Sequence, residues 1–262
     1  MMRLFNVGHS AEPRFVSYLR GIGFEVKEFE TSVLMYHPES DSYWWSKEFD
    51  IGDGLAQNVT GTFHEQIAIS RGIKPSQWRV SGAMGHYGGS LDGLCKAPSR
   101  YQLSEDIILS LSFKTNNTGS GYAKVAEEHL QKSKPKHWAQ ECQYGYKMGI
   151  KYCIYMIENK NDSDITFKVI ELDWNYGAQL EKKAEQIIFA KEPPPRISEN
   201  KSFFNCKYCH LAGICHDGEK PEKNCRSCRN AMPTENAEWK RSLHGIIPED
   251  FIKKECDAWL PI

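Results

Sequence analysis

The chain has 262 residues, enough to bury a sizeable core and to form one medium domain with an appendage. Its 33 lysines and arginines nearly balance its 34 aspartates and glutamates, which argues against a protein that only coats DNA, since such proteins are usually basic. No run of about 18 apolar residues predicts a transmembrane helix, and the N-terminus lacks the apolar stretch of a signal peptide. We therefore expect a protein without a membrane partner, working in the cytoplasm, or in the host cytoplasm if its source is viral.

Hydrophobic periodicity predicts helices and strands that alternate along the chain, which is typical of an α/β fold. Expected helices cover 11–21, 63–71, 122–131, 136–149 and 175–191, and expected strands lie within 24–36, 77–96, 106–115, 152–157 and 165–172. A proline triplet follows the last helix and marks a boundary. We therefore divide the chain into a domain at 1–192, a proline-rich linker at 193–202 and a cysteine-rich module at 203–262.

The segment from 107 to 115 is the most informative stretch, because it reads as a strand with two different faces. Side chains alternate along a strand, so one face is apolar and the other polar. The apolar face carries Leu109, Leu111 and Phe113, and the polar face carries Ser110, Ser112 and Lys114. We expect the polar face to line a cleft. A glycine-rich turn around Asp92 precedes this strand, and its glycines let a backbone approach a phosphate.

The helix expected at 136–149 adds a second set of polar residues. Gln140 and Tyr144 are four residues apart, so they share one helix face. Three basic residues lead into this face and are candidate DNA contacts, namely Lys134, Lys136 and His137. Taken in order, the Asp-Gly turn, the strand that ends in lysine and the Gln-x-x-x-Tyr helix resemble the PD-(D/E)XK nuclease superfamily. Within it, they are most similar to RecB-like, phage-type recombination exonucleases.

The resemblance implies a restriction-endonuclease-like α/β fold, with a mixed central sheet flanked by helices. It also implies a metal-dependent DNA exonuclease that hydrolyses phosphodiester bonds at DNA ends in recombination or replication. Its partners would be DNA and either a recombination protein or further copies of the chain. In this chemistry Mg²⁺ or Mn²⁺ is the cofactor that activates water. The catalytic positions that match are Asp92, Ser112, Lys114, Gln140, Tyr144 and Glu12, and the metal positions are Asp92, Ser112 and the carbonyl of Phe113.

Two further residues have open roles. Glu12 matches an acidic residue on the family's opening helix, where it would be an outer ligand or general base. The alternative is a carboxylate at a helix start, favoured by the macrodipole, and Pro13 fits the first turn of such a helix. His86 lies in the glycine-rich loop before Asp92, where it contacts a phosphate or is a structural histidine.

Ser112 is where the sequence departs from the family, which has a glutamate or aspartate at this position as a metal ligand. A neutral hydroxyl is a poor ligand for a hard cation. Three explanations are open: an engineered knock-out, a carboxylate supplied from elsewhere, such as Glu12 or Glu141, or a catalytically silent protein that binds DNA or a partner. Glu141 is rotated by about 100° from Gln140 on an ideal helix, which makes it an imperfect substitute. On this basis Ser112→Glu is expected to be much more active.

Six of the nine cysteines lie after residue 203. Two Cys-x-x-Cys pairs are separated by fifteen residues, a spacing typical of structural Zn²⁺, and their members are Cys206, Cys209, Cys225 and Cys228. Further candidate ligands are Cys215, His216 and Cys256. A 4Fe–4S cluster is the less favoured alternative, because thiolates suit both. Trp239 lies in this locally basic module and is a candidate for stacking on a base. Cys142 and Cys153 are expected to be small core residues.

Overall fold

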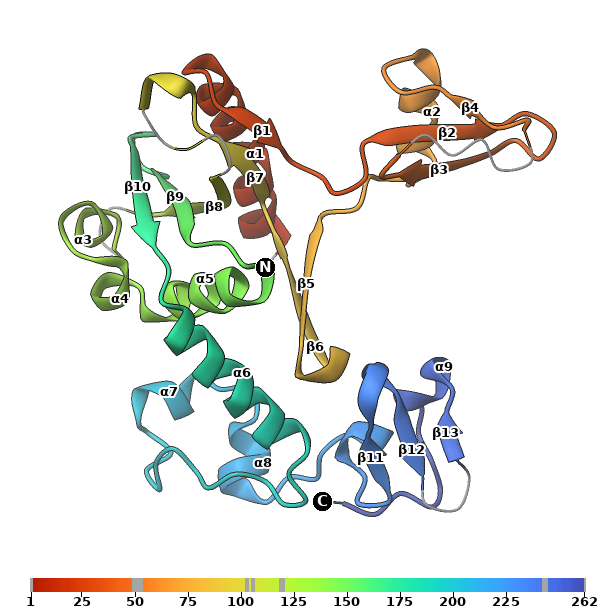
Figure 1. Ribbon diagram of the computed structural model, residues 1–262. Coiled ribbons are helices and arrows are strands. Elements are labelled where there is room, and N and C mark those ends of the chain that lie inside the picture. The colour runs from red at the N-terminus through yellow and green to blue at the C-terminus, as the bar shows by residue number, and fades with distance from the viewer. Residues whose placement is uncertain are drawn as a thin grey trace. The chain divides into compact units, whose positions relative to one another are not determined.

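The structure, a computed structural model, describes residues 2–48, 54–101, 104, 107–117, 121–241 and 245–261, with the backbone alone for 2–9. It is a mixed α/β protein (Figure 1). The helices are α1 (Met2–Gly21), α2 (Phe63–Ser70), α3 (Tyr122–Glu127), α4 (Leu130–Ser133), α5 (Pro135–Met148), α6 (Trp174–Ile188), α7 (Phe204–Lys207), α8 (Ala212–Asp217) and α9 (Glu249–Ile252). Short 3₁₀ turns are η1 (Ala83–Gly85), η2 (Ser99–Tyr101), η4 (Cys225–Ser227) and η5 (Glu235–Ala237).

The strands fall into four sheets among the described residues. The first six are β1 (Glu25–Lys27), β2 (Val33–His37), β3 (Ser42–Ser46), β4 (Gln57–Asn58), β5 (Trp78–Gly82) and β6 (Tyr87–Leu91). The rest are β7 (Gly93–Lys96), β8 (Ile108–Asn116), β9 (Tyr152–Asn159), β10 (Ile165–Glu171), β11 (Ala231–Pro233), β12 (Trp239–Arg241) and β13 (Gly245–Ile247). The central sheet has the order β1-β7-β8-β9-β10, and only the β8–β9 pair in it is parallel. The predicted mixed central sheet is therefore confirmed.

Helices pack against both faces of β8, as the alternation of its side chains requires. The apolar face meets α1, where Phe15 and Phe113 pack with ring centroids 5.1 Å apart. The opposite face of the sheet meets α3, α4 and α5, whose Trp138 and Cys142 pack with Cys153 and other buried residues of β9. The two predicted faces and the core positions of Cys142 and Cys153 are thus confirmed. Burial of these apolar side chains is the main force that holds the sheet between its helices.

Two helix predictions need correction. Helix α1 begins at Met2, so Pro13 lies inside it and Glu12 lies near its middle. The proposed first-turn proline and the macrodipole role of Glu12 are therefore wrong, because the macrodipole acts within the first turn. The predicted helix at 122–131 is two helices, since Glu128 is extended and the imidazole of His129 caps α4 by accepting a hydrogen bond from the Gln131 N–H.

A segment inserted between β1 and β5 has a small core of its own. Strands β3-β2-β4 form a separate antiparallel sheet, and α2 packs on it. The buried residues are Leu34, Tyr43, Val59 and Ala68. At the base of the insertion, a β-bridge joins Phe29 to Gln77, and the Glu30 N–H donates to the carbonyl of Ser76 at 2.8 Å. The sequence patterns predicted strands and a helix here but not a self-contained insertion.

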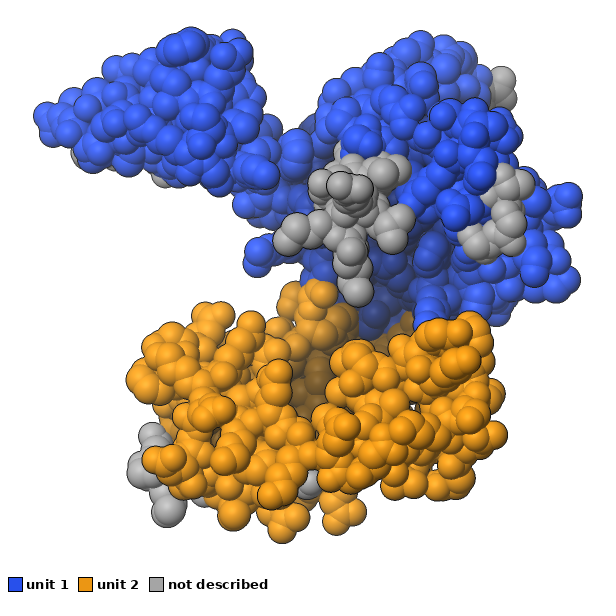
Figure 2. Space-filling view, turned by 180° about the vertical axis from the view of Figure 1, so that it is seen from behind, with its two compact units in different colours: residues 1–80, 89–178 blue, residues 81–88, 179–262 orange. Residues whose placement is uncertain are grey.

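The chain divides into two compact units, coloured separately in Figure 2. The first contains residues 1–80 and 89–178, and the second contains 81–88 and 179–262. Residues 179–192, expected in the N-terminal domain, group with the cysteine-rich tail. Strands β5 and β6 and helix α6 each run from one unit into the other. Within the described residues, no helix is long and apolar enough to cross a membrane.

Candidate functional site

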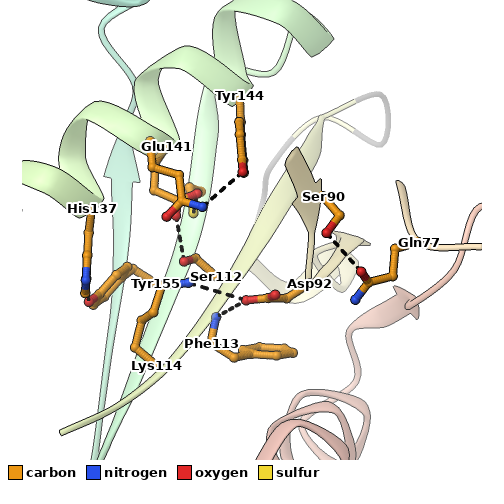
Figure 3. A network of polar contacts seen from close by, with 12 residues as sticks. Gln77, Ser90, Asp92, Ser112, Phe113, Lys114, His137, Glu141, Tyr144 and Tyr155 are labelled. Carbon is orange, nitrogen blue, oxygen red and sulfur yellow. Dashed lines mark hydrogen bonds and ion pairs between the residues drawn. The ribbon is translucent and has the colours of Figure 1, made fainter. Parts of the chain in front are cut away.

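Asp92 lies at the bend between β6 and β7, beside the end of β8 (Figure 3). Its carboxylate accepts a hydrogen bond of 2.6 Å from the Phe113 N–H. The same oxygen is 3.7 Å from the Lys114 ammonium, which is about one quarter exposed. The antiparallel pairing of β7 with β8 brings the turn and the strand end together, as the sequence order implied. A carboxylate and a lysine therefore share one partly exposed position.

Ser112 is covered by helix α5 and is only 1% exposed. It therefore does not line an open cleft as expected, because α5 packs on the polar face of β8. The Ser112 hydroxyl donates a 2.7 Å hydrogen bond to the carboxylate of Glu141, which is 2% exposed. The other oxygen of that carboxylate is 3.7 Å from the thiol of Cys153. A carboxylate from the helix thus occupies the position next to the serine of the strand.

Glu141 has a perturbed electrostatic environment. Burial raises the pKa of its carboxyl, and the nearby negative charge of Asp92 raises it further. Lys114 and the hydrogen bond from Ser112 act in the opposite direction by favouring the carboxylate. Buried charges are costly unless they are paired or bind a cation. Asp92, Lys114 and Glu141 therefore form one electrostatically coupled group.

The position of Glu141 follows from the inward face of α5. The buried residues of this helix are Trp138, Glu141, Cys142 and Gly145, at the i, i+3, i+4 and i+7 spacing of one helix face. A charged residue in that series is the signal in the sequence that would have placed Glu141 against the sheet. The rotation from Gln140 does not disqualify it, because the sheet approaches the helix on the Glu141 side.

Gln140 and Tyr144 do share a helix face, as predicted. The Gln140 amide donates to the Tyr144 hydroxyl at 3.0 Å. The Tyr144 hydroxyl lies so close to Gly89 on β6 that a methyl group there would overlap it. One residue further, Ser90 donates to the side-chain oxygen of Gln77 at 2.9 Å. The approach of Tyr144 to Gly89 thus places α5 against the strand that leads to Asp92, and the Ser90 bond joins that strand to Gln77.

Basic side chains flank the site on α5 and the turn before it. His137 lies 2.7 Å from the Tyr155 hydroxyl through its Nδ1 atom. Burial, together with the positive charges of Lys114 and Lys134, lowers the pKa of His137 to about 4. Burial and the charge of Lys124 lower the pKa of Lys134. Lys136 is exposed. The three predicted DNA contacts therefore begin α5, one turn before Glu141.

Glu12 is half-buried on α1, and α1 packs on the apolar face of β8, which is the face opposite to Ser112. Its proposed role as outer ligand or general base stays a prediction. The contacts of His86 favour the structural role over the contact with phosphate. Its Nε2 atom lies 2.6 Å from the Thr234 carbonyl, and its ring meets Phe189 and Trp239 edge-on.

The cysteine-rich tail presents all its cysteines as free thiols. Cys206 and Cys228 are buried, and Cys209 is exposed. Across the part of the chain that the structure describes, no three His, Cys, Asp or Glu side chains are grouped so that they hold a metal ion. Burial raises the pKa of Cys225, and the neighbouring Cys228 and Cys256 raise it further, so these three thiols share one neighbourhood. Trp239 belongs to β12 and is half-buried.

No protein-family model matches this chain, and a search of curated proteins finds no matching relative. The assignment of a function therefore depends on the residues of the site.

Proposed function

We propose that the protein is a metal-dependent DNA exonuclease of the PD-(D/E)XK superfamily, with a restriction-endonuclease-like fold, in which Glu141 supplies the carboxylate that Ser112 lacks. The observation that carries this proposal is the hydrogen bond of 2.7 Å from Ser112 to the buried carboxylate of Glu141. Asp92 and Lys114 are its charged neighbours. In this proposal, the carboxylate that the family carries on the strand at position 112 is supplied by Glu141 on helix α5.

The donor chemistry suits Mg²⁺ or Mn²⁺. Such ions are bound by one or two carboxylates, with waters and substrate phosphate oxygens completing the shell. Asp92 and Glu141 provide two carboxylates, and the carbonyl of Phe113 follows Ser112 directly in the strand. A cation between the carboxylates would also offset the mutual repulsion and the burial that raise the pKa of Glu141.

The remaining residues have roles that follow from their positions. A divalent cation held by Asp92 and Glu141 would polarise the substrate phosphate and activate a water. Lys114 places a positive charge beside Asp92, where it stabilises charge that develops on the phosphate. Tyr144, held by Gln140, lies against Gly89 of β6 and so places the helix that carries Glu141 beside the strand that leads to Asp92. Lys134 and Lys136 contact the DNA backbone, since charged lysine side chains neutralise phosphates. His137, whose pKa is lowered to about 4, approaches the DNA as a neutral side chain at neutral pH.

The test is a Mn²⁺-dependent cleavage assay on linear duplex, single-stranded and circular DNA. The variants are Asp92→Asn and Glu141→Gln, and the matched control is Glu128→Gln, a carboxylate on the surface paired with Lys132. Wild type and the control are expected to degrade linear DNA, and the two site variants to lose at least about a hundredfold in rate, more than the usual effect of losing a residue that only orients a metal ligand.

Two outcomes would contradict the proposal. Cleavage that survives in Glu141→Gln would remove Glu141 from the metal site. Binding of DNA without cleavage by the wild type would favour the silent DNA-binding alternative, in which the fold is kept and hydrolysis is lost.

The zinc assignment is proposed separately for the tail. The spacing of the two Cys-x-x-Cys pairs supports this proposal, and Cys256 is a further candidate ligand. Metal analysis of the purified protein tests it, with about one zinc per chain expected. A brown, iron-containing protein would favour a 4Fe–4S cluster instead.

A further inference from the structure

The tip of the β5–β6 hairpin belongs to the second unit, whereas its base belongs to the first. The tip is η1, which joins β5 to β6. Strand β6 then leaves the second unit at Gly88 and ends at Leu91, directly before Asp92. The proposed metal ligand is therefore attached to a strand whose other end is built into the cysteine-rich unit.

Two side chains, Glu181 and His86, hold the tip within that unit. Glu181 on α6 is 9% exposed, and one of its oxygens accepts a hydrogen bond of 2.8 Å from the Ala83 N–H. Its other oxygen accepts a hydrogen bond from the Tyr87 hydroxyl. The buried Glu181 carboxylate thus joins the two sides of the hairpin, at Ala83, where the turn begins, and at Tyr87, where β6 begins. Charge-assisted hydrogen bonds of this kind are stronger than neutral ones.

His86 makes the second attachment. Its ring nitrogen lies 2.6 Å from the Thr234 carbonyl, and its ring meets Phe189 and Trp239 at 5.8 and 5.7 Å, both edge-on. Such aromatic pairs contribute beyond the burial of their area. His86 therefore contacts the residue that follows α6, the residue that precedes η5, and strand β12.

The backbone at the contact is strained on both sides. Ala83 and Met84 in η1 have φ values of 45° and 56°, and Asn236 and Ala237 in η5 both have 62°. Non-glycine residues adopt this left-handed region only at a cost, and they keep it where surrounding contacts enforce it. Gly85 meets Ala237 so closely that a side chain at Gly85 would be 2.9 Å from its methyl group. Two strained turns thus fit against each other.

We propose that the C-terminal unit positions Asp92 through this hairpin, with Glu181 and His86 as positioning residues. The inference rests on the proposed function for the role of Asp92. From the held tip, β6 continues along the chain past the Tyr144 hydroxyl at Gly89 and the Gln77 side chain at Ser90 to Asp92. Outer contacts that orient metal ligands tune metal affinity more than they change the chemistry itself.

The test compares the wild type with the double variant His86→Ala/Tyr87→Phe, which removes the His86 attachment and one of the two hydrogen bonds to Glu181. The matched control is Ile252→Ala, which opens a cavity at a buried position of α9 in the same unit without touching the hairpin residues. Hydrogen exchange is measured on peptides covering 87–92, with 152–159 as the reference. Mn²⁺ binding is followed by calorimetry, and cleavage is measured across a Mn²⁺ titration.

In the double variant, exchange within 87–92 is expected to accelerate about tenfold or more while 152–159 is unchanged. The Mn²⁺ concentration for half-maximal binding and cleavage is expected to rise about ten- to hundredfold, with the rate at saturating Mn²⁺ nearly retained. Ile252→Ala is expected to leave both quantities as in the wild type.

Equal exchange in 87–92 of wild type and double variant would overturn the inference. So would faster exchange with an unchanged Mn²⁺ requirement, or an equal effect of Ile252→Ala. A wild type that binds Mn²⁺ but cleaves no DNA would refute the proposed nuclease, while the exchange and Mn²⁺-binding results would still decide the positioning role.

Discussion

The most direct test of the site moves the carboxylate between Glu141 on helix α5 and position 112 on strand β8 by substitution. Glu141 already places a carboxylate against Ser112, so Ser112→Glu would put two carboxylates in one buried space. This reverses the expectation from sequence alone, where restoring the family's glutamate increases activity. The reciprocal variant, Ser112→Glu/Glu141→Ser, returns the carboxylate to the strand and conserves the total side-chain volume.

The expected loss of stability in Ser112→Glu comes from two changes at the site. Two unit charges about 4 Å apart repel by about 4 kcal/mol at an effective dielectric constant of about 20. Loss of the hydrogen bond from Ser112 to a charged acceptor adds about 1.5–3 kcal/mol. The single variant is therefore expected to lose about 5.5–7 kcal/mol of stability, which is comparable to the whole stability of many domains. Protonation of one carboxyl would reduce this loss and would also remove a metal ligand.

The assay combines urea unfolding with Mn²⁺-dependent cleavage for wild type, both single variants and the double variant. Ser112→Glu is expected to be unstable and inactive, Glu141→Ser inactive, and the double variant to recover most of the stability and part of the activity. Glu141→Gln is expected to be at least as stable as wild type, because burial disfavours the charge of Glu141. A Ser112→Glu protein that is as stable as wild type and more active would refute the reasoning.

Three other predictions use separate measurements. Folding lowers the pKa of His137 from its ordinary value of 6.5 to about 4. The neutral imidazole therefore contributes its full stability above pH 6.5, and this contribution is lost as the pH falls toward 4. Urea unfolding should show that His137→Gln loses less stability than the wild type between about pH 7.5 and 4.5. Gly89→Ala should lower stability by about 1–3 kcal/mol through overlap with Tyr144, with partial recovery in Gly89→Ala/Tyr144→Phe, and equal stability of Gly89→Ala and wild type would contradict this. Cys228→Ser should release most of the zinc found in the wild type, and unchanged zinc content would exclude Cys228 as a ligand.

The sequence predicted the central strand and its neighbours because their signals are local. Alternation in β8 identified which side chains face α1 and which face α5, and the four-residue spacing of Gln140 and Tyr144 identified one helix face. Such patterns depend only on the period of the backbone. The mixed central sheet, by contrast, was an expectation from the family resemblance and not from these patterns.

The hydrogen bond between Ser112 and Glu141 was beyond local patterns, because it joins residues 29 positions apart. A charged residue within the inward series of α5 contradicted the binary pattern of that helix, and such conflicts tend to mark functional sites. The attachment of His86 to residues almost 150 positions later depends entirely on tertiary contacts. The sequence pattern does not predict the start of α1, because a proline is typical of a first helical turn, whereas Pro13 lies inside this helix.

The closed base of the inserted segment has an evolutionary consequence. Its two ends meet at the Phe29–Gln77 bridge, so a chain that lacked residues 31–75 would need only a short turn to reconnect β1 with β5. The entropy of closing a loop changes slowly with its length, and separately cored segments are gained or exchanged most easily at such points. Changes in the length or sequence of this segment are therefore expected to leave the register of the strands around Asp92 and Lys114 unchanged.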